Sequence, residues 1–527
     1  MNKSVRCFYS VICFVTVLDC SAEIFYVDSK LGSDSNDGNT IEKPWKSSGR
    51  VNQQLFQAED EVLFHRGREW ESVVIKINTS NIKLGAYGDG EKPRLLGSVR
   101  RNDWRLVKGI PGVYVMNVPR PIEQKKWGNW QVQLVMEEGF VFYHREENNT
   151  DLRVLKQGSF SYSIKKQRLY IRPLNDTILG KSFYIGQQEN IIEIQHANID
   201  SLVIQDLDIS LANRYGIGPW WQGDVVSQGD ITIKNNLFIG NAFSAICLSG
   251  GMPYNNIVID KNMIRENGAE GVYIGKHIAK QSLKITNNVI GSEIQDSFGW
   301  RGEGPTSAFN GDGIDIKLGN RQVLVEGNII RNLNIGTGIS YHSGDSIITN
   351  NVIRDVGMSG GRWPAGIMVD IDDDYGTSVI SSNHIQVNES YGINVRGKAA
   401  IGPPLIIEKN WIELSSDNPF SQIGFTAMNS ANVTIKNNKG TGGFYAIKMT
   451  GMSPNNIVIK DNNWGHVNNF IFLPNSQLSG LRIFNNYFCK GVSSYIEWGN
   501  LVKEIDFKGS KGYLRRSDSF FEENCPQ

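Results

Sequence analysis

A short alternation of apolar and polar residues recurs along the second half of the chain. Each copy has aliphatic or β-branched residues at every second position and ends in asparagine, as in ITIKNN, LKITNN and VTIKNN. The recurring asparagines are Asn236, Asn262, Asn288, Asn328, Asn351, Asn383, Asn410, Asn438, Asn462 and Asn486. A period of two with many β-branched residues is typical of strands and excludes helical repeats. The pattern predicts repeated short strands between residues 200 and 490.

The spacing of these asparagines predicts a solenoid. Most neighbouring copies lie 23 to 32 residues apart, and the interval from Asn288 to Asn328 is 40 residues. Periods of roughly 20–50 residues are typical of repeats that bury their apolar faces only against neighbouring repeats. About 25 residues with two or three short strands fit one coil of a parallel β-helix, whose coils stack ~4.8 Å apart. We expect the asparagines to form a side-chain hydrogen-bond ladder.

The rest of the chain divides around this repeat. Lys3 and Arg6 precede an apolar stretch and a small-residue exit, which predicts a secretory signal peptide cleaved after Ala22. The expected divisions are residues 1–22 as signal peptide, 23–100 as N-terminal cap and first coils, 101–197 as β-rich insertion, 198–490 as parallel β-helix with the Asn ladder, and 491–527 as C-terminal cap or tail.

Composition restricts the function classes. The chain has 54 basic and 54 acidic residues and a formal net charge of zero, so it lacks the bulk attraction used by most nucleic-acid and anionic-membrane binders. No stretch beyond the signal approaches the ~20 apolar residues of a membrane span. Cys247, Cys489 and Cys525 are too far apart to indicate a disulfide framework or a zinc site. We expect a secreted or periplasmic monomer that binds neither nucleic acid nor membrane.

The segments before the repeat resemble a known group of proteins. FYVDSKLGSDSNDGNTIEKPWKS, DEVLFHRGREW and GAYGDGEKPRLLGS lie between residues 25 and 98 and resemble the opening of many secreted carbohydrate-active β-helix proteins. Together with the Asn-marked coils, they resemble the pectate-lyase-like superfamily, which contains polysaccharide lyases, glycoside hydrolases and uronate epimerases. The resemblance implies an all-β fold, a right-handed parallel β-helix solenoid with an N-terminal cap and an inserted β-rich subdomain. It implies a polysaccharide as binding partner.

A second strand in each coil predicts a column of charged side chains. We aligned the segments that begin at Gly216, Ala245, Gly271, Gly313, Gly338, Gly366, Gly392, Gly424 and Ala446. Their second and fourth positions are apolar and must point into the coil, so the third and fifth positions must point outward. The fifth column reads Trp220, Ser249, Gly275, Lys317, His342, Asp370, Arg396, Met428 and Thr450. Four ionisable residues therefore stand on consecutive coils, with β-carbons ~5 Å apart.

Two long loops are expected beside this column. The longest interval between asparagines leads to Lys317, and the next longest leads to Asp370. Loops of this length can rim a binding groove. Exposed indoles offer flat apolar surfaces to sugar rings, and flanking charges bind hydroxyls or carboxylates. Our substrate-binding candidates are Trp220, Trp300, Arg301, Arg362 and Trp363.

Our leading hypothesis for the chemistry is β-elimination on an acidic, uronic-acid-containing polysaccharide. A lyase needs a base for the proton beside the carboxylate and a cation for the developing enolate, and Lys317, His342 and Arg396 offer this set. Neighbouring positive charge is expected to lower the pKa of Lys317 toward that of a useful base. In the superfamily that this chain resembles, Lys or Arg is a common base and Ca²⁺ a common carboxylate binder. Asp312 and Asp315 in NGDGIDIK offer oxygen ligands for Ca²⁺.

A glycoside hydrolase is the alternative, since it needs two carboxylates, one as acid and one as base or nucleophile. Asp315 and Asp370 offer such a pair, with β-carbons about 11–12 Å apart from the coil and residue spacings. NGDGIDI resembles the NTDG motif of polygalacturonases, but their paired Asp, Gly-His-Gly and Arg-x-Lys motifs are absent from the sequence. A uronate epimerase and a non-catalytic glycan-binding β-helix remain further alternatives.

Overall fold

The computed structural model describes the chain with interruptions. The described residues are 22–78, 81–120, 130–138, 141–145, 151–195, 200–219, 229–250, 253–293, 311–342, 344–357, 365–371, 376–397, 404–428, 432–450, 456–473, 481–488, 494–498 and 505–506. They form mostly strands, with a short helix α1 (Ser48–Val51) and a 3-10 helix η2 (Leu152–Val154). In these ranges no helix is long and apolar enough to cross a membrane. The predicted signal peptide lies almost wholly outside them.

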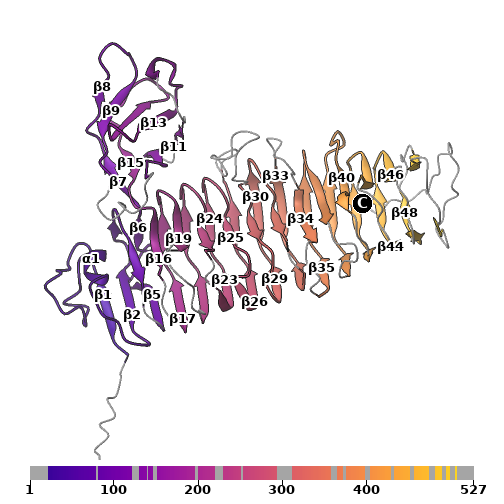
Figure 1. The fold of residues 1–527 in the computed structure, drawn as a ribbon, viewed down its shortest axis with the longest axis horizontal. Helices are drawn as coiled ribbons and strands as arrows, with labels where there is room; N and C mark the ends of the chain where they lie inside the picture. The colour runs from indigo at the N-terminus through magenta and orange to yellow at the C-terminus, as the bar shows by residue number, and fades with distance from the viewer. Residues whose placement is uncertain are drawn as a thin grey trace, which may run out of the picture.

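Three long parallel sheets run along the described part of the solenoid, and each coil gives one strand to each sheet in turn (Figure 1). Sheet A contains β1 (Ile24–Val27), β2 (Glu61–His65), β5 (Ile82–Tyr87), β17 (Ser201–Gln205), β20 (Asp230–Lys234), β23 (Tyr254–Asp260), β26 (Ala279–Thr286), β29 (Val323–Glu326), β32 (Ser346–Thr349), β35 (Ser378–Ser381), β38 (Leu405–Glu408), β41 (Val433–Lys436), β44 (Ile457–Lys460), β47 (Leu481–Phe484) and β50 (Ile505–Asp506).

Sheets B and C complete each coil. Sheet B contains β3 (Glu69–Trp70), β6 (Arg94–Leu96), β18 (Asp208–Ser210), β21 (Leu237–Ile239), β24 (Met263–Arg265), β27 (Val289–Gly291), β30 (Ile329–Leu333), β33 (Val352–Val356), β36 (His384–Val387), β39 (Trp411–Leu414), β42 (Lys439–Thr441), β45 (Asn463–Gly465) and β48 (Tyr487–Phe488). Sheet C contains β4 (Ile75–Ile77), β16 (Asn190–Ile194), β19 (Tyr215–Pro219), β22 (Ile246–Leu248), β25 (Val272–Ile274), β28 (Ile314–Ile316), β31 (Ile339–Tyr341), β34 (Ala365–Ile371), β37 (Tyr391–Gly397), β40 (Ser421–Met428), β43 (Tyr445–Met449), β46 (Asn469–Leu473) and β49 (Ser494–Trp498). The predicted all-β parallel β-helix is confirmed.

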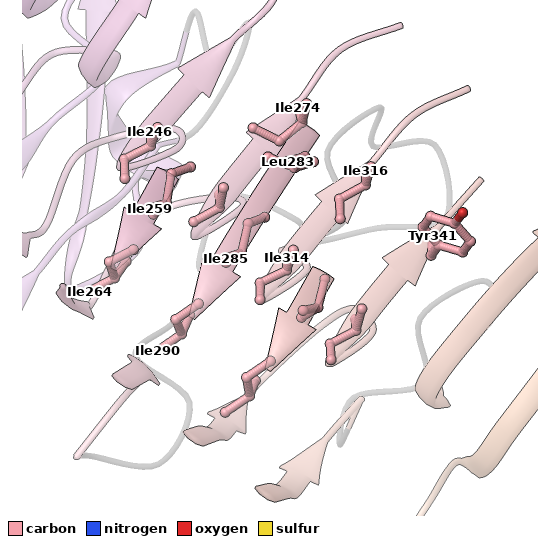
Figure 2. Packing of buried hydrophobic residues seen from close by; sticks show 14 of the residues in the cluster. Ile246, Ile259, Ile264, Ile274, Leu283, Ile285, Ile290, Ile314, Ile316 and Tyr341 are labelled. Atoms are coloured by element: carbon pink, nitrogen blue, oxygen red, sulfur yellow. The ribbon is translucent and has the colours of Figure 1, made fainter. Parts of the chain in front are cut away.

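The core is a stack of aliphatic side chains from all three sheets. Figure 2 shows isoleucines of successive coils pointing into the same interior, among them Ile285 from sheet A, Ile290 from sheet B and Ile314 from sheet C. These three side chains are fully buried. Because β-branched residues pack well on pleated strands, the repeated apolar positions bury each coil against the next. The alternation seen in the sequence therefore follows from this packing.

The asparagine ladder is confirmed in the described coils from Asn236 to Asn486. In each step, the Oδ1 of one asparagine accepts hydrogen bonds from the backbone N–H and the Nδ2 of the asparagine one coil earlier. The residue before each ladder position has a left-handed backbone, such as Asn287 with φ of 55° and Gly327 with φ of 66°. This turn directs the asparagine inward, so the ladder satisfies the backbone groups where sheet A meets sheet B.

A small lobe stands beside the N-terminal end of the solenoid (Figure 1). Its strands follow β6 and precede β16, where the chain passes from sheet B to sheet C. One sheet has the order β11 (Val141–Phe142), β10 (Val135–Glu137), β15 (Phe183–Gly186) and β7 (Ser98–Arg101). The other has the order β12 (His144–Arg145), β13 (Ser159–Ser163), β14 (Arg168–Arg172), β9 (Tyr114–Asn117) and β8 (Arg105–Leu106). The strands of this lobe pair antiparallel except for β12 with β13, and the lobe is the inserted β-rich subdomain of the expected fold.

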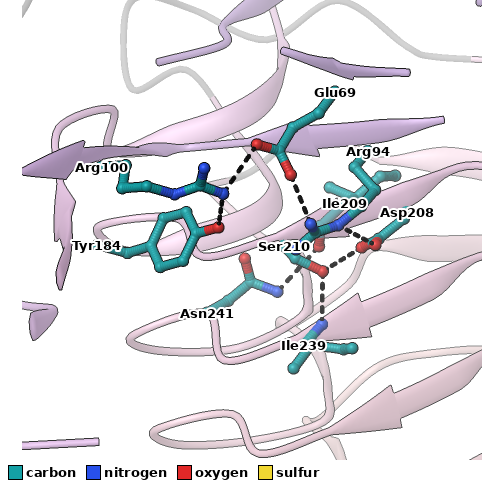
Figure 3. Close-up of polar contacts among 9 residues, drawn as sticks. All are labelled: Glu69, Arg94, Arg100, Tyr184, Asp208, Ile209, Ser210, Ile239 and Asn241. Carbon is teal, nitrogen blue, oxygen red and sulfur yellow. Dashed lines mark hydrogen bonds and ion pairs between the residues drawn. The ribbon is translucent and has the colours of Figure 1, made fainter. Parts of the chain in front are cut away.

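Charged side chains join the lobe to the first coils, as Figure 3 shows. Glu69 on sheet B accepts hydrogen bonds from Arg94 and Arg100, and Arg100 also donates to Tyr184 of the lobe. Arg94 Nε lies 3.2 Å from Asp208 Oδ2 on the next coil. An apolar cluster joins Met136 of the lobe with residues of the neighbouring coils. The lobe is therefore held both by ion pairs and by buried apolar surface.

The ladder predicts a position-dependent loss of stability. Asn351→Leu would remove the acceptor for Asn328 and the donor to Asn383 and Val325, all buried. Each unsatisfied buried group costs ~1–3 kcal/mol, so we expect a loss of roughly 3 kcal/mol or more in unfolding free energy. Asn486→Leu should cost less, because Asn486 has no following ladder partner among the described residues. Chemical denaturation of both variants tests this, and equal losses would contradict a cooperative ladder.

Candidate functional site

The strand register of sheet C confirms the predicted column of charged residues. Asp315 pairs with Ser340 in adjacent strands, and Asp370 pairs with Arg396. The backbone N–H of His342 donates to Ile316 O at 2.9 Å, which places His342 beside Lys317. Lys317, His342, Asp370 and Arg396 therefore follow one another on consecutive coils.

The expected continuation of this column at Met428 is wrong. Gly424 was aligned at the first position of its segment, but it pairs with Asn394, which stands at a third position. The segment therefore begins at Gln422, whose buried side chain donates to Gly442 O at 2.9 Å, and Thr426 takes the fifth position. The alignment failed here because glycine was used as the marker of the first position, and this coil has glutamine there.

Glycine marks a tight corner at the start of several other sheet C strands, among them those that follow Gly313 and Gly338. A Cβ on Gly313 would lie 2.6 Å from Gly338 O, and one on Gly338 would lie 2.5 Å from Gly366 O. No side chain fits such a close approach between coils. Asp312, just before Gly313, is buried, and the charge of Asp315 acts on it, so the two carboxyl groups share one cluster.

Asp315 and Lys317 form a tight ion pair. Lys317 Nζ lies 2.7 Å from Asp315 Oδ2, and the Asp315 side chain is 2% exposed against 24% for Lys317. Burial opposes the charged ammonium, but the charge and hydrogen bond of Asp315 outweigh it and raise the pKa of Lys317. The expectation of a lowered pKa was therefore wrong, because the nearest charge is negative. Lys317 is held as a cation.

His342 connects the two ends of the column. Its Nδ1 lies 3.2 Å from Asp370 Oδ2, and its Nε2 lies 3.3 Å from Ser340 Oγ and 3.9 Å from Asp315 Oδ1. Arg396 Nε lies 3.4 Å from Asp370 Oδ1. Burial alone would raise the pKa of Asp370, but the hydrogen bond with His342 and the charge of Arg396 lower it. Asp370 is thus a fixed anion that orients both neighbours.

Asp312 lies deeper than the column. Its Oδ1 accepts a hydrogen bond from the Thr337 backbone N–H at 2.6 Å, and its Oδ2 has no hydrogen-bond partner among the described residues. Burial, and then the charge of Asp315, raise the pKa of Asp312 well above its usual range. A carboxyl group with a raised pKa therefore stands in the same cluster as the ion pair of Asp315 and Lys317.

Sequence reasoning missed Glu270, one coil before Asp312. Glu270 is buried, and its Oε2 accepts a hydrogen bond from Ser244 Oγ at 2.9 Å. Burial and the charge of Asp315 raise the pKa of Glu270 as well. The available signal was an acidic residue directly before glycine in EGVYIG and again in DGIDIK. Glu270 and Asp312 each stand one residue before the first position of the aligned segments, so the outward columns do not include them.

The remaining candidates stay predictions. Trp220, Trp300, Arg301, Arg362 and Trp363 lie outside the described residues. For Ca²⁺, the described residues contain no group of three His, Cys, Asp or Glu side chains that could hold a metal. Asp312 and Asp315 offer few of the 6–8 oxygens that Ca²⁺ prefers, and Lys317 already contacts Asp315. The described donors do not fit a calcium site by themselves.

The glycine corner can be tested by adding one methyl group. Gly338→Ala should destabilise the protein, since its Cβ would lie 2.5 Å from Gly366 O and 2.7 Å from Ile353 Cγ2. Overpacking of this kind typically costs about 1–3 kcal/mol. Gly49→Ala is the control, because the nearest atom to its Cβ, Ser47 Oγ, is 3.4 Å away. Thermal unfolding should separate the two, and an unchanged midpoint for Gly338→Ala would rule out the tight corner.

Comparison with known proteins identifies the family to which the chain belongs. A search of the curated proteins gave no match. Similar solved structures include XylC in complex with xylose (14% identity, TM-score 0.42, covering 89% of this chain and 76% of that chain) and a GH136 lacto-N-biosidase from Eubacterium ramulus (14%, 0.40, 92% and 68%). Another is the Dettilon tailspike protein (16%, 0.28, 59% and 62%). The sequence matches the family described as the right handed beta helix region over residues 190–412 and 277–464, more than half of its length. The chain belongs to the right-handed β-helix family.

Proposed function

We propose that this protein is a carbohydrate-active enzyme that hydrolyses glycosidic bonds at Asp312 and Asp315. The observation that carries the proposal is the ion pair between Lys317 and Asp315. An ammonium with a raised pKa is not available as the base that elimination needs. The same ammonium is paired with Asp315 at 2.7 Å, while burial and the charge of Asp315 raise the pKa of Asp312 well above its usual range. Glycoside hydrolases use a carboxylic acid with a raised pKa beside a second carboxyl group that acts as base or nucleophile.

The roles follow from these charges. In this proposal Asp312 is the acid that donates its proton to the glycosidic oxygen as the bond to the anomeric carbon breaks, which requires the bound glycan to displace the cover of this buried carboxyl. Asp315 acts as the base that activates water, or as the nucleophile that a water later displaces. Lys317 stabilises the negative charge of Asp315, and its ammonium takes no proton. In either route the two products gain the elements of one water molecule.

The other end of the column serves to position the substrate. Asp370 holds His342 through Nδ1, so Nε2 faces Ser340 and Asp315. Arg396 contacts the same carboxylate from the next coil. Both His342 and Arg396 keep partly exposed side chains, which can donate hydrogen bonds to a bound glycan.

Elimination remains the second candidate, with His342 in place of Lys317 as base. The observation that favours it is the short distance of 3.5 Å between His342 Nε2 and Lys317 Nζ. A base and a cation would then lie side by side, and the cation could stabilise the negative charge of a developing enolate. Calcium remains a prediction, and neither mechanism assigns it a step. We further propose that the protein acts as a secreted or periplasmic monomer on a polysaccharide.

Product chemistry separates the two mechanisms. We propose incubating the protein with polygalacturonate, alginate, xylan and galactan, and following both new reducing ends and the ultraviolet absorbance of unsaturated uronates. Hydrolysis predicts reducing ends without that absorbance. Asp315→Asn and Lys317→Met should each lower the rate ~10²–10⁴-fold, and added calcium should not restore it. Lys284→Met, at an exposed lysine on sheet A, is the matched control. Unsaturated products would contradict the hydrolase and favour the lyase.

Asp312 should be a site where function opposes stability. In the unfolded chain Asp312 ionises near pH ~3.9, whereas the fold keeps it neutral to much higher pH. The folded state then binds more protons, so the contribution of Asp312 to stability falls as pH rises above that value. Asp312→Asn, which stays neutral, should abolish activity yet raise the melting temperature near neutral pH by on the order of 1–3 °C.

Melting curves from acid to neutral pH test this stability claim. The gain from Asp312→Asn should vanish toward acid pH, where the carboxyl is neutral in both states. Asp417→Asn, at an exposed position on the same solenoid, should leave the melting temperature unchanged at every pH. A lower melting temperature for Asp312→Asn at neutral pH would refute the neutral carboxyl.

A further inference from the structure

We infer that the sugar bound at Asp315 and Asp370 is a neutral, hydroxyl-bearing unit and not a uronic acid. The inference rests on the proposed function and names the substrate class of the same site. The sequence predicts an acidic polysaccharide as substrate, because it shows the cations of the column but not the carboxylates that pair with them. The present inference replaces that expectation with a neutral sugar. Three independent features of the described residues carry it.

The first feature is that each exposed cation already has its own recessed carboxylate. Lys317 pairs with Asp315 at 2.7 Å and Arg396 pairs with Asp370 at 3.4 Å. The carboxylates are 2% and 10% exposed, whereas the cations are 24% and 26% exposed. A uronate carboxylate would reach these cations only in competition with a fixed, nearer anion. The pairs leave little net positive charge to attract it.

The second feature is a carboxylate oxygen of Asp315 that accepts no hydrogen bond. Asp315 Oδ1 is buried and has no hydrogen-bond partner among the described residues. His342 Nε2 is 3.9 Å away, too far for a hydrogen bond. Asp315 thus adds an acceptor without a donor to the surroundings of Lys317, and a further group that only accepts hydrogen bonds would find no donor in it. An ionised uronate carboxyl only accepts hydrogen bonds and would face Asp315 with like charge.

The third feature is the response of the site to further negative charge. Burial and the charge of Asp315 raise the pKa values of both Asp312 and Glu270. The surroundings thus already oppose ionisation of two protein carboxyls. A substrate carboxylate placed in the same cluster would meet the same desolvation and repulsion.

Matched substrate pairs that differ only at C6 test the inference. We propose p-nitrophenyl glucosides against glucuronides and galactosides against galacturonides, each in both anomers, together with polygalacturonate against its carboxyl-reduced polymer. The wild-type protein should prefer the neutral member of an accepted pair by at least ~10-fold in kcat/KM. Asp370→Asn, which removes the negative charge that faces Arg396, should shift the preference toward the uronide, whereas Asp417→Asn should leave it unchanged. Melting curves confirm that each variant is folded.

Each outcome decides one claim. Hydrolysis that favours the uronide would overturn the neutral-sugar inference and leave the hydrolase intact. If no pair is hydrolysed, calorimetric binding of the polymer pair to Asp312→Asn gives the order of affinities, and tighter binding of polygalacturonate would again overturn the inference. Failure to bind or cleave any of these glycans, or those of the first panel, would overturn the proposed function and this inference together.

Discussion

The in-register pairing of each coil with the next is the constraint on which this protein depends. A single coil cannot cover its own apolar side chains, and stacking at ~4.8 Å buries them against the same positions of neighbouring coils. The Asn ladder fixes that register at one corner, because each amide is bonded to the amides before and after it. Once the register is fixed, residues about 25 positions apart in sequence become direct neighbours.

The candidate site is a consequence of this stacking. Alternation along β28 sends Ile314 and Ile316 into the core and leaves Asp315 on the outer side, where it meets Lys317. Asp312 precedes this strand by two residues and lies in the same cluster, where the charge of Asp315 raises its pKa. One short segment therefore supplies two carboxyl groups and the cation that pairs with one of them, Asp315. The next three coils add His342, Asp370 and Arg396.

Much of this arrangement could be predicted from the sequence, because alternation and a regular repeat determine which residues face outward and which coils are adjacent. The fold, the ladder and the column from Lys317 to Arg396 were obtained in this way. The protonation of Lys317 was not, since it depends on how closely Asp315 approaches, and a column alignment contains no such distances. Glu270 is not found in this way because it lies before the first aligned position and is buried, and Met428 is misplaced because Gln422 stands where the other coils have a small residue.

The central claim is that Lys317 is a permanent cation paired with Asp315 and not a titrating base. It can be measured directly by following the side-chain NMR signals of ¹³C-labelled lysine through a pH titration, with Lys317→Arg to assign the resonance. The account predicts that the pKa of Lys317 lies above its ordinary value of 10.5 and falls when Asp315 is replaced by Asn. A pKa near neutral pH that does not respond to Asp315→Asn would contradict the account and restore Lys317 as the base of an elimination.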